Sequence, residues 1–126
     1  MAKTRVLDVG NCDPDHGMIR SMLLQHFDVD VDRVMSVDEA LASMRERSYA
    51  LVLFNRLIFS DGSEGIELLR RAKADPMLSG IPIMMISNLA EAQAASLEAR
   101  GEPGFGKQAI GAPATLEAIS PYLPRK

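Results

Sequence analysis

The feature that most constrains the fold of this chain is the regular alternation of short apolar runs with helical patterns. The runs RVLDV (5–9), ALVLF (50–54) and IPIMMI (81–86) predict strands. The last two are apolar throughout, as strands covered on both faces of a parallel sheet are. The stretch VDVDRVMS (29–36) begins with strict alternation, which is typical of a half-exposed edge strand, and 103–106 is a weaker fifth candidate.

Helical patterns fill the intervals between these runs, and several carry end signals. Capping boxes, an early proline and a closing glycine mark where helices begin and end. Helices are expected from Asp13 or Asp15 to Phe27, after the capping box of Ser36 and Glu39, from about 63 to 74, from a box-like start at Asn88 and Glu91 to Gly101, and from Pro113 to Pro121.

The order is therefore a strand followed by a helix, five times. Right-handed crossovers turn such a chain into an open parallel sheet with helices on both faces. Because the second run looks like an edge strand, we expect the doubly wound, flavodoxin-like α/β fold with strand order 2-1-3-4-5. Residues 1–126 are expected to form one domain, since this length buries a single core.

Charge and cysteine content exclude several classes of function. The net charge is −3 and basic residues are flanked by acidic ones, so nucleic acid is not an expected partner. Cys12 is the only cysteine, the N-terminus lacks the apolar run of a signal peptide, and IPIMMI is too short to cross a bilayer. We expect a cytoplasmic protein without membrane association.

The stretch GEPGFGKQ (101–108) matches a P-loop, G-x-x-x-x-G-K-[ST], at every position except the last. A P-loop joins a strand to a long helix and uses its hydroxyl to bind Mg²⁺. Gln108 supplies no hydroxyl, and the following AIGAP breaks any helix. This near-match therefore does not predict a nucleotide site, and Lys107 needs another explanation.

In a doubly wound sheet, chemistry sits where the carboxyl ends of the strands meet. The polar residues expected there come from four loops. They are Asn11, Cys12 and Asp13 after the first strand, Asn55 and Arg56 after the third, Ser87 and Asn88 after the fourth, and Lys107 after the fifth.

These strand ends resemble those of the receiver domain of two-component response regulators (CheY-like), over about residues 4–123. In that family an acidic pair after the first strand holds Mg²⁺, and the matching text here is GNCDPD. The resemblance places Asn55 at the position of the phosphorylated Asp. It places Ser87, Phe105 and Lys107 at the positions of the family's Ser or Thr, aromatic residue and Lys.

The departures from the family pattern decide the expected function. The amide of Asn55 is a poor nucleophile, whereas phosphorylation needs a carboxylate. If Pro14 sets the alignment, the acidic pair becomes Asn11 and Cys12. Sliding by one residue gives Gly10–Asn11 or Cys12–Asp13, and no choice restores two carboxylates. We therefore expect no Mg²⁺, no metal site and no cofactor.

This pattern favours a pseudo-receiver, a non-enzymatic module that binds a signalling protein or itself without being phosphorylated. Two alternatives stay open. A phosphoacceptor could use a relocated Asp61 or Asp13. A flavodoxin-like module could bind a small ligand or a flavin, although NCDPDHG lacks the hydroxyl residues that hold a flavin phosphate.

Two neighbouring features give further expectations. Leu57, Ile58 and Phe59 are three apolar residues in a loop beside the site, so they form either a lid or a partner surface. Lys107 is expected to be solvent-accessible or within hydrogen-bond reach of Asp13 or Asn55, since a buried unpaired ammonium is too costly.

Overall fold

The computed structural model describes residues 3–126, and its centre is a parallel sheet in the order β2-β1-β3-β4-β5. This order and the parallel pairing confirm the predicted doubly wound fold. The strands lie within a few residues of the predicted runs. They are β1 (Thr4–Val9), β2 (Val29–Val34), β3 (Leu51–Asn55), β4 (Ile83–Ile86) and β5 (Glu102–Phe105).

Five α-helices and a short 3-10 helix connect and follow the strands. Each crossover from one strand to the next contains one helix, and the last helix follows β5. The helices are α1 (Asp13–His26), α2 (Val37–Glu46), α3 (Ile66–Ala74), α4 (Ala90–Glu98), the 3-10 helix η1 (Lys107–Ala109) and α5 (Pro113–Ile119).

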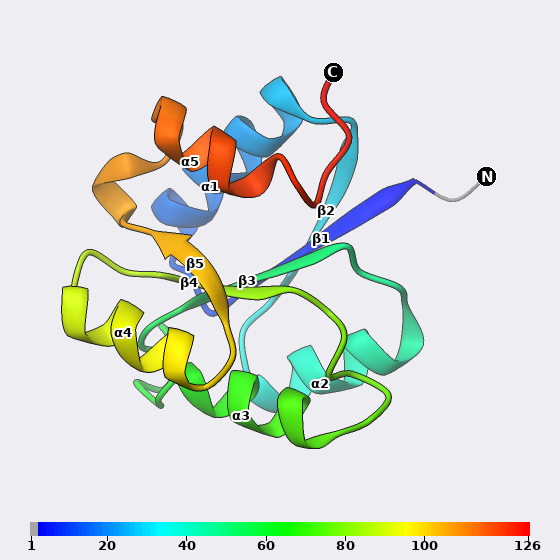
Figure 1. The fold of residues 1–126 in the computed structure, drawn as a ribbon, viewed down its shortest axis with the longest axis vertical. Helices are drawn as coiled ribbons and strands as arrows, with labels where there is room; N and C mark the ends of the chain where they lie inside the picture. The colour runs from blue at the N-terminus through cyan, green and yellow to red at the C-terminus, as the bar shows by residue number, and fades with distance from the viewer. Residues whose placement is uncertain (1–2) are drawn as a thin grey trace.

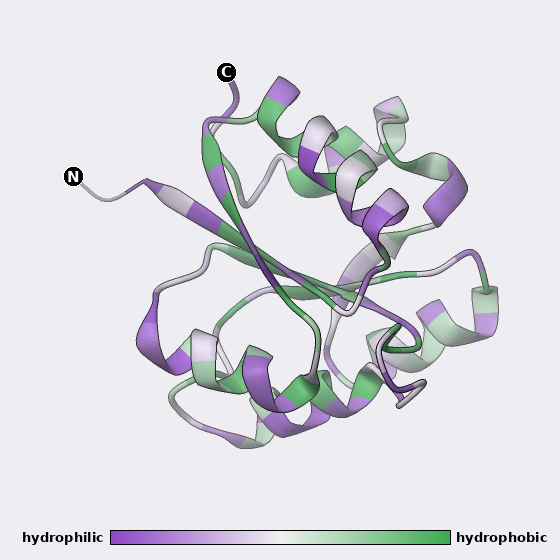
Figure 2. Cartoon of the chain, turned by 180° about the vertical axis from the view of Figure 1, so that it is seen from behind, coloured by the Kyte–Doolittle hydropathy of each residue, from purple (hydrophilic) through white to green (hydrophobic). Residues whose placement is uncertain are grey.

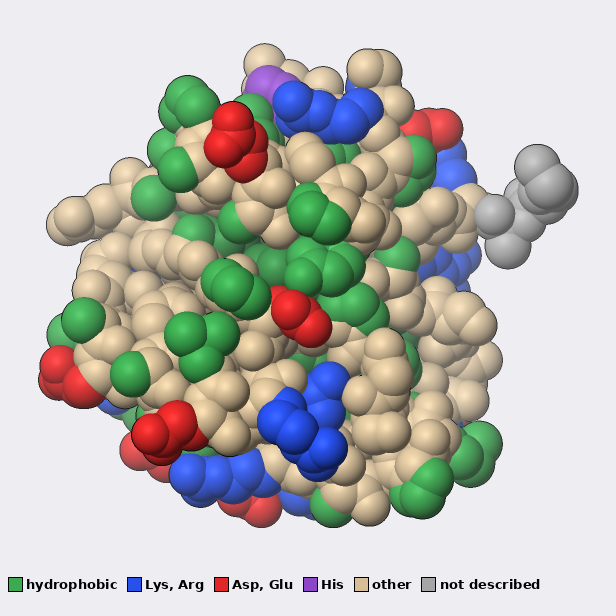
Figure 3. All heavy atoms as spheres, in the orientation of Figure 1, with side chains coloured by type: hydrophobic (Ala, Val, Ile, Leu, Met, Phe, Trp, Pro, Cys, Tyr) green, Lys and Arg blue, Asp and Glu red, His purple; other side chains and the backbone are tan. Residues whose placement is uncertain are grey.

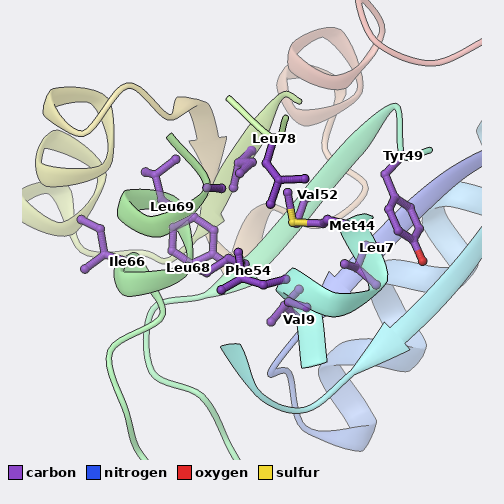
Figure 4. Packing of buried hydrophobic residues seen from close by; sticks show 14 of the residues in the cluster. Leu7, Val9, Met44, Tyr49, Val52, Phe54, Ile66, Leu68, Leu69 and Leu78 are labelled. Carbon is purple, nitrogen blue, oxygen red and sulfur yellow. The ribbon is translucent and has the colours of Figure 1, made fainter. Parts of the chain in front are cut away.

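The helices form two layers, with α1 and α5 on one face of the sheet and α2, α3 and α4 on the other (Figure 1). Each layer encloses its own core, and the strands contribute apolar side chains to both. In Figure 2 much of the sheet is accordingly coloured as hydrophobic. The core under α2 and α3 is built around Phe54, Leu68 and Leu69 (Figure 4). Burial on both faces explains why β3 and β4 are apolar throughout.

Three helix starts test the predicted end signals. Ser36 caps α2 as expected, because its hydroxyl accepts the backbone N–H of Glu39 at 3.0 Å. The predicted box at Asn88 is wrong: Leu89 is the N-cap of α4, and the Asn88 side chain accepts the Gln108 N–H instead. The first helix is capped by Cys12, with no side-chain cap hydrogen bond.

The edge formed by β5 is the least covered part of the sheet. Its burial alternates, and Pro103, which has no N–H to donate, is exposed there, as suits an edge strand. Apolar side chains gather at the centre of the face drawn in Figure 3, over this edge and between the two helix layers. None of the helices in the described range 3–126 is both long enough and apolar enough to span a bilayer.

Substitution of glycine by alanine is expected to have opposite effects on stability at two positions. A Cβ on Gly65, at the start of α3, would lie 2.0 Å from the Asn55 carbonyl oxygen, whereas a Cβ on Gly17 in α1 would meet nothing within 4 Å. Gly65→Ala should lower the free energy of unfolding by about 2–3 kcal/mol through overpacking. Gly17→Ala should raise it by about 0.5–1 kcal/mol. Urea unfolding measures both, and similar changes in the two variants would contradict this packing.

Candidate functional site

The carboxyl ends of the strands lie together on the left of Figure 1, where the loops after β1, β3, β4 and β5 meet. A cleft of about 510 Å³ opens between the loops after β3, β4 and β5. Its polar lining is Asn55, Arg56, Ser87, Asn88 and Lys107, all of which the sequence placed at this edge.

The carbonyl of Gly10 joins two of these loops. It accepts hydrogen bonds from the Asn55 amide at 3.1 Å and from the Phe59 backbone N–H at 2.9 Å. Gly10 has a φ of 76°, and a Cβ there would lie 2.5 Å from the side chain of Ile58. Only glycine therefore fits both the backbone conformation and the contact with the loop after β3.

The strand register clarifies which residues flank Asn55. Val9 is paired with Phe54, so Gly10 follows β1 at the level of Asn55. Asn11 comes next and is fully buried, while Cys12 is half-buried at the start of α1. Gly10, Asn11 and Cys12 thus follow β1 directly, and none of the three has a carboxylate.

A buried carboxylate does lie near this loop, but on β1 itself. Asp8 is fully buried, and its two oxygens are bonded at 2.6 Å each, one by the Asn11 side-chain amide and one by Nδ1 of His16. A carboxylate only accepts hydrogen bonds, so the imidazole donates. Both oxygens of Asp8 are thus occupied by groups of the protein.

The two carboxylates in the first turn of α1 also have cationic partners. Arg33, from β2, donates to the Asn11 carbonyl at 2.8 Å and lies 2.8 Å from an Asp13 oxygen. Lys107, from the other side of the site, lies 2.9 Å from an Asp15 oxygen. The start of α1 is therefore held between an arginine and a lysine.

The position of Lys107 agrees with the expected exposure but gives it another partner. Its ammonium pairs with Asp15, two residues beyond the predicted Asp13, and Asp13 is paired with Arg33. The Lys107 side chain is 35% exposed, so the ammonium is neither buried nor unpaired. The hydrogen bond from Lys107 is the main reason that the pKa of Asp15 lies below 3.8, with help from the Cys12 thiol and against the effect of burial.

The other predicted site residues have clear structural roles. Ser87 is 7% exposed, and its hydroxyl oxygen accepts the Leu89 N–H at 3.1 Å, which shapes the turn before α4. Phe105 is buried in the core between the sheet and the layer of α1 and α5. In the described chain no cluster of three or more His, Cys, Asp or Glu side chains is arranged to hold a metal ion.

The loop after β3 corrects the expectation for its apolar residues. Ile58 is fully buried against Gly10 and cannot be part of a partner surface, whereas Phe59 is 66% exposed and Leu57 is half-buried. The loop is fixed to the body of the protein by the Ser60 hydroxyl, which donates to the Met35 carbonyl at 2.7 Å. Ile58 thus forms the lid, and Phe59 remains on the surface.

The donor set at this edge does not fit the Mg²⁺ that the receiver resemblance implies. Mg²⁺ is bound in proteins through carboxylates. Those of Asp8, Asp13 and Asp15 are bonded to protein groups, and position 55 carries an amide. One buried oxygen, Oδ1 of Asn11, has no partner among the described residues, but a single amide oxygen is a poor substitute for an acidic pair.

Sequence reasoning missed His16, Arg33 and Asp15 as parts of this arrangement. One signal was present, since Asp8 interrupts an otherwise apolar strand and a buried carboxylate needs partners. The partners themselves come from α1 and β2, and only the three-dimensional register brings them together.

The contrast between Ile58 and Phe59 gives a stability prediction. Ile58→Ala should lower the free energy of unfolding by about 2–4 kcal/mol, because it empties a fully buried site. Phe59→Ser should change it by less than about 1 kcal/mol, because the ring is mostly exposed. Chemical denaturation of both variants checks this. A larger loss of stability for Phe59→Ser than for Ile58→Ala would show that Phe59, and not Ile58, forms the lid.

The ion pair of Lys107 and Asp15 gives a pH prediction. A lowered carboxyl pKa contributes stability above pH 3.8, and this contribution is lost as the pH falls through the lower pKa of the folded state. Lys107→Met should raise the pKa of Asp15 toward 3.8, measured by NMR titration of its side-chain carboxyl. At neutral pH the variant should lose less than about 1 kcal/mol, because the pair is partly exposed. An unchanged Asp15 pKa would contradict this pairing.

Comparison with known proteins places the fold. No protein-family model matches the chain, and no curated protein matches it in sequence. Among solved structures, the receiver domain of the Francisella response regulator 1452 is 15% identical, with a TM-score of 0.78 over 94% of this chain and 96% of that one.

Two further structures agree. The non-phosphorylated receiver domain of the stress response regulator RcsB from Escherichia coli is 17% identical, with a TM-score of 0.75 over 95% of each chain. A sensor protein from Polaromonas sp. JS666 is 19% identical, with a TM-score of 0.80 over 94% of this chain and 95% of that one. Identities this low establish a shared architecture alone, so the chain has the flavodoxin-like fold of response-regulator receiver domains.

Proposed function

We propose that this chain is a receiver-like signalling module that acts by binding another protein and is not phosphorylated. The observation that carries the proposal is the state of the carboxylates around Asn55. Each of the three carboxylates on β1 and α1 is bonded within the protein: Asp8 to Asn11 and His16, Asp13 to Arg33, and Asp15 to Lys107.

These bonds bear on both requirements of phosphoryl transfer. The reaction needs a nucleophile of sufficient strength and a divalent cation that neutralises the phosphoryl oxygens. Asn55 offers an amide, and its nitrogen donates to the Gly10 carbonyl. A metal ion at this edge would have to compete with arginine, lysine and histidine for its ligands. The arrangement thus provides no carboxylate nucleophile at position 55 and disfavours binding of the metal ion.

A relocated phosphoacceptor is the weaker candidate. Asp61 is fully exposed, and Ser63 lowers its pKa through hydrogen bonds from its hydroxyl and its backbone N–H. Its groove is lined by three further carboxylates, those of Asp38, Glu64 and Glu67, and by one cation, Arg71, which is paired with Asp38 at 3.0 Å. A phosphoryl group there would face like charges, which disfavours transfer.

The direct test uses a small phosphodonor. We expect the wild-type protein, incubated with Mg²⁺ and acetyl phosphate, to keep its mass, and beryllofluoride to leave its amide NMR spectrum unchanged. A stoichiometric phosphoryl adduct would contradict the proposal, and its site would identify the relocated acceptor. Flavin absorbance in the purified protein would instead support a ligand-binding module.

Restoring the acceptor carboxylate alone should not restore phosphorylation. Asn55→Asp supplies a nucleophile, but it leaves Asn11 and Cys12, which the sequence aligns with the acidic pair, without a carboxylate. We expect no Mg²⁺-dependent labelling of this variant by acetyl phosphate. The matched control is the triple variant Asn11→Asp/Cys12→Asp/Asn55→Asp, which keeps Gly10, provided that circular dichroism shows it folded. Efficient labelling of the single variant would show that the metal ligands are not the limiting loss.

A further inference from the structure

The lining of the cleft beside Asn55 is chemically mixed. Exposed or half-buried apolar side chains of Leu57, Phe59 and Leu89 line it together with the polar residues. Phe59 is 66% exposed and Leu89 is 42% exposed, so both apolar side chains are available to an incoming group. A volume of about 510 Å³ is within the usual range of ligand sites.

The charged side chains that line the cleft are cationic. Arg56 and Lys107 line the cleft, and no Asp or Glu does, although the whole protein has a net charge of −3. Lys107 shares its charge with Asp15, which lies outside the cleft lining. Glu64 and Glu91 line the adjoining groove between α3 and α4, yet among the described residues neither forms an ion pair with Arg56.

Neutral donors at the cleft also suit an anion. The Ser87 oxygen accepts the Leu89 N–H, which leaves the hydroxyl hydrogen free to donate. The oxygen of the Asn88 amide accepts from Gln108, which leaves its NH₂ group free. Two cations and two neutral donors therefore surround one space, and the matching ligand is a carboxylate or a similar oxyanion.

We propose that this cleft docks a segment of a partner protein in which an acidic residue stands next to an apolar one. The carboxylate would bind between Arg56 and Lys107, and the apolar side chain would cover Phe59 and Leu89. The proposal rests on the proposed function and names the chemistry of its partner. The cleft is open to solvent on one side, which suits side chains presented by another protein better than a small molecule that must be enclosed.

The test uses two capped dipeptides that differ only in charge. N-acetyl-leucyl-aspartic acid amide and N-acetyl-leucyl-asparagine amide are titrated into the ¹⁵N-labelled full chain, and amide shifts are recorded. The acidic dipeptide should shift the amides of Arg56, Phe59, Ser87 and Lys107 in a saturable way. The neutral dipeptide should bind about tenfold more weakly, as expected for the loss of a charge-assisted hydrogen bond.

Variants assign the contacts to the cleft. Arg56→Gln should weaken the acidic dipeptide about tenfold, whereas Arg20→Gln, which removes an exposed arginine on α1, should leave its affinity unchanged. Phe59→Ser should weaken both dipeptides, because it removes the apolar contact. Circular dichroism confirms that each variant is folded, so a loss of binding is not mistaken for unfolding.

Three outcomes would overturn the proposal. Equal binding of the two dipeptides would exclude carboxylate recognition, and shifts confined to another face would exclude the cleft. Acetate or inorganic phosphate binding as tightly as the acidic dipeptide would show a small-anion site without an apolar contact. None of these outcomes involves phosphoryl transfer, so the proposed function stands or falls separately on the acetyl phosphate experiment.

Discussion

The structure of the site depends on the close contact between Gly10 and the loop after β3. The Gly10 carbonyl binds both the Asn55 amide and the Phe59 N–H, and its missing side chain leaves room for Ile58. This contact fixes the orientation of the Asn55 side chain. It also determines which apolar residue of the loop is buried and which is exposed. Ile58 fills the space above β1, so Phe59 is directed outward. Both the orientation of the Asn55 amide and the exposed position of Phe59 follow from it.

The second organising feature is that the carboxylates near this contact are neutralised from within. In a site built for a metal ion, acidic side chains are left to be satisfied by the cation. Here Asp13 and Asp15 hold α1 to β2 and to the segment after β5 through Arg33 and Lys107. These pairs join three elements of the sheet and its helices. These pairs therefore have a structural role, because they hold the start of α1 against its neighbours.

Much of the fold could be predicted from the sequence, because periodicity reports burial directly. The apolar runs at 50–54 and 81–86 correspond to β3 and β4, two of the three interior strands, and the alternating run corresponds to the edge strand β2. The capping box at Ser36 was also predictable, since it depends on residues three positions apart. The box at Asn88 was not, because a tertiary hydrogen bond from Gln108 occupies that side chain.

The residues of the candidate site could be predicted from the sequence, but the ion pairs and hydrogen bonds between them could not. The strand ends identified Asn55, Ser87 and Lys107, since topology alone brings them to one edge. Pairing could not be inferred in the same way. Arg33 and Asp15 are separated from their partners in the sequence by whole helices or strands. Arg33 pairs with Asp13, and Lys107 pairs with Asp15.

The central claim is that the carboxylates at this edge are occupied by protein groups and do not hold a divalent cation. Paramagnetic broadening by Mn²⁺ in ¹⁵N NMR spectra tests it most directly, because Mn²⁺ reports any site of the Mg²⁺ type. The account predicts that the amides of residues 8–16 and of Asn55 broaden no more than those beside the exposed carboxylates of Asp28 and Asp30. Selective, saturable broadening centred on Asn11 and Asn55 would contradict it.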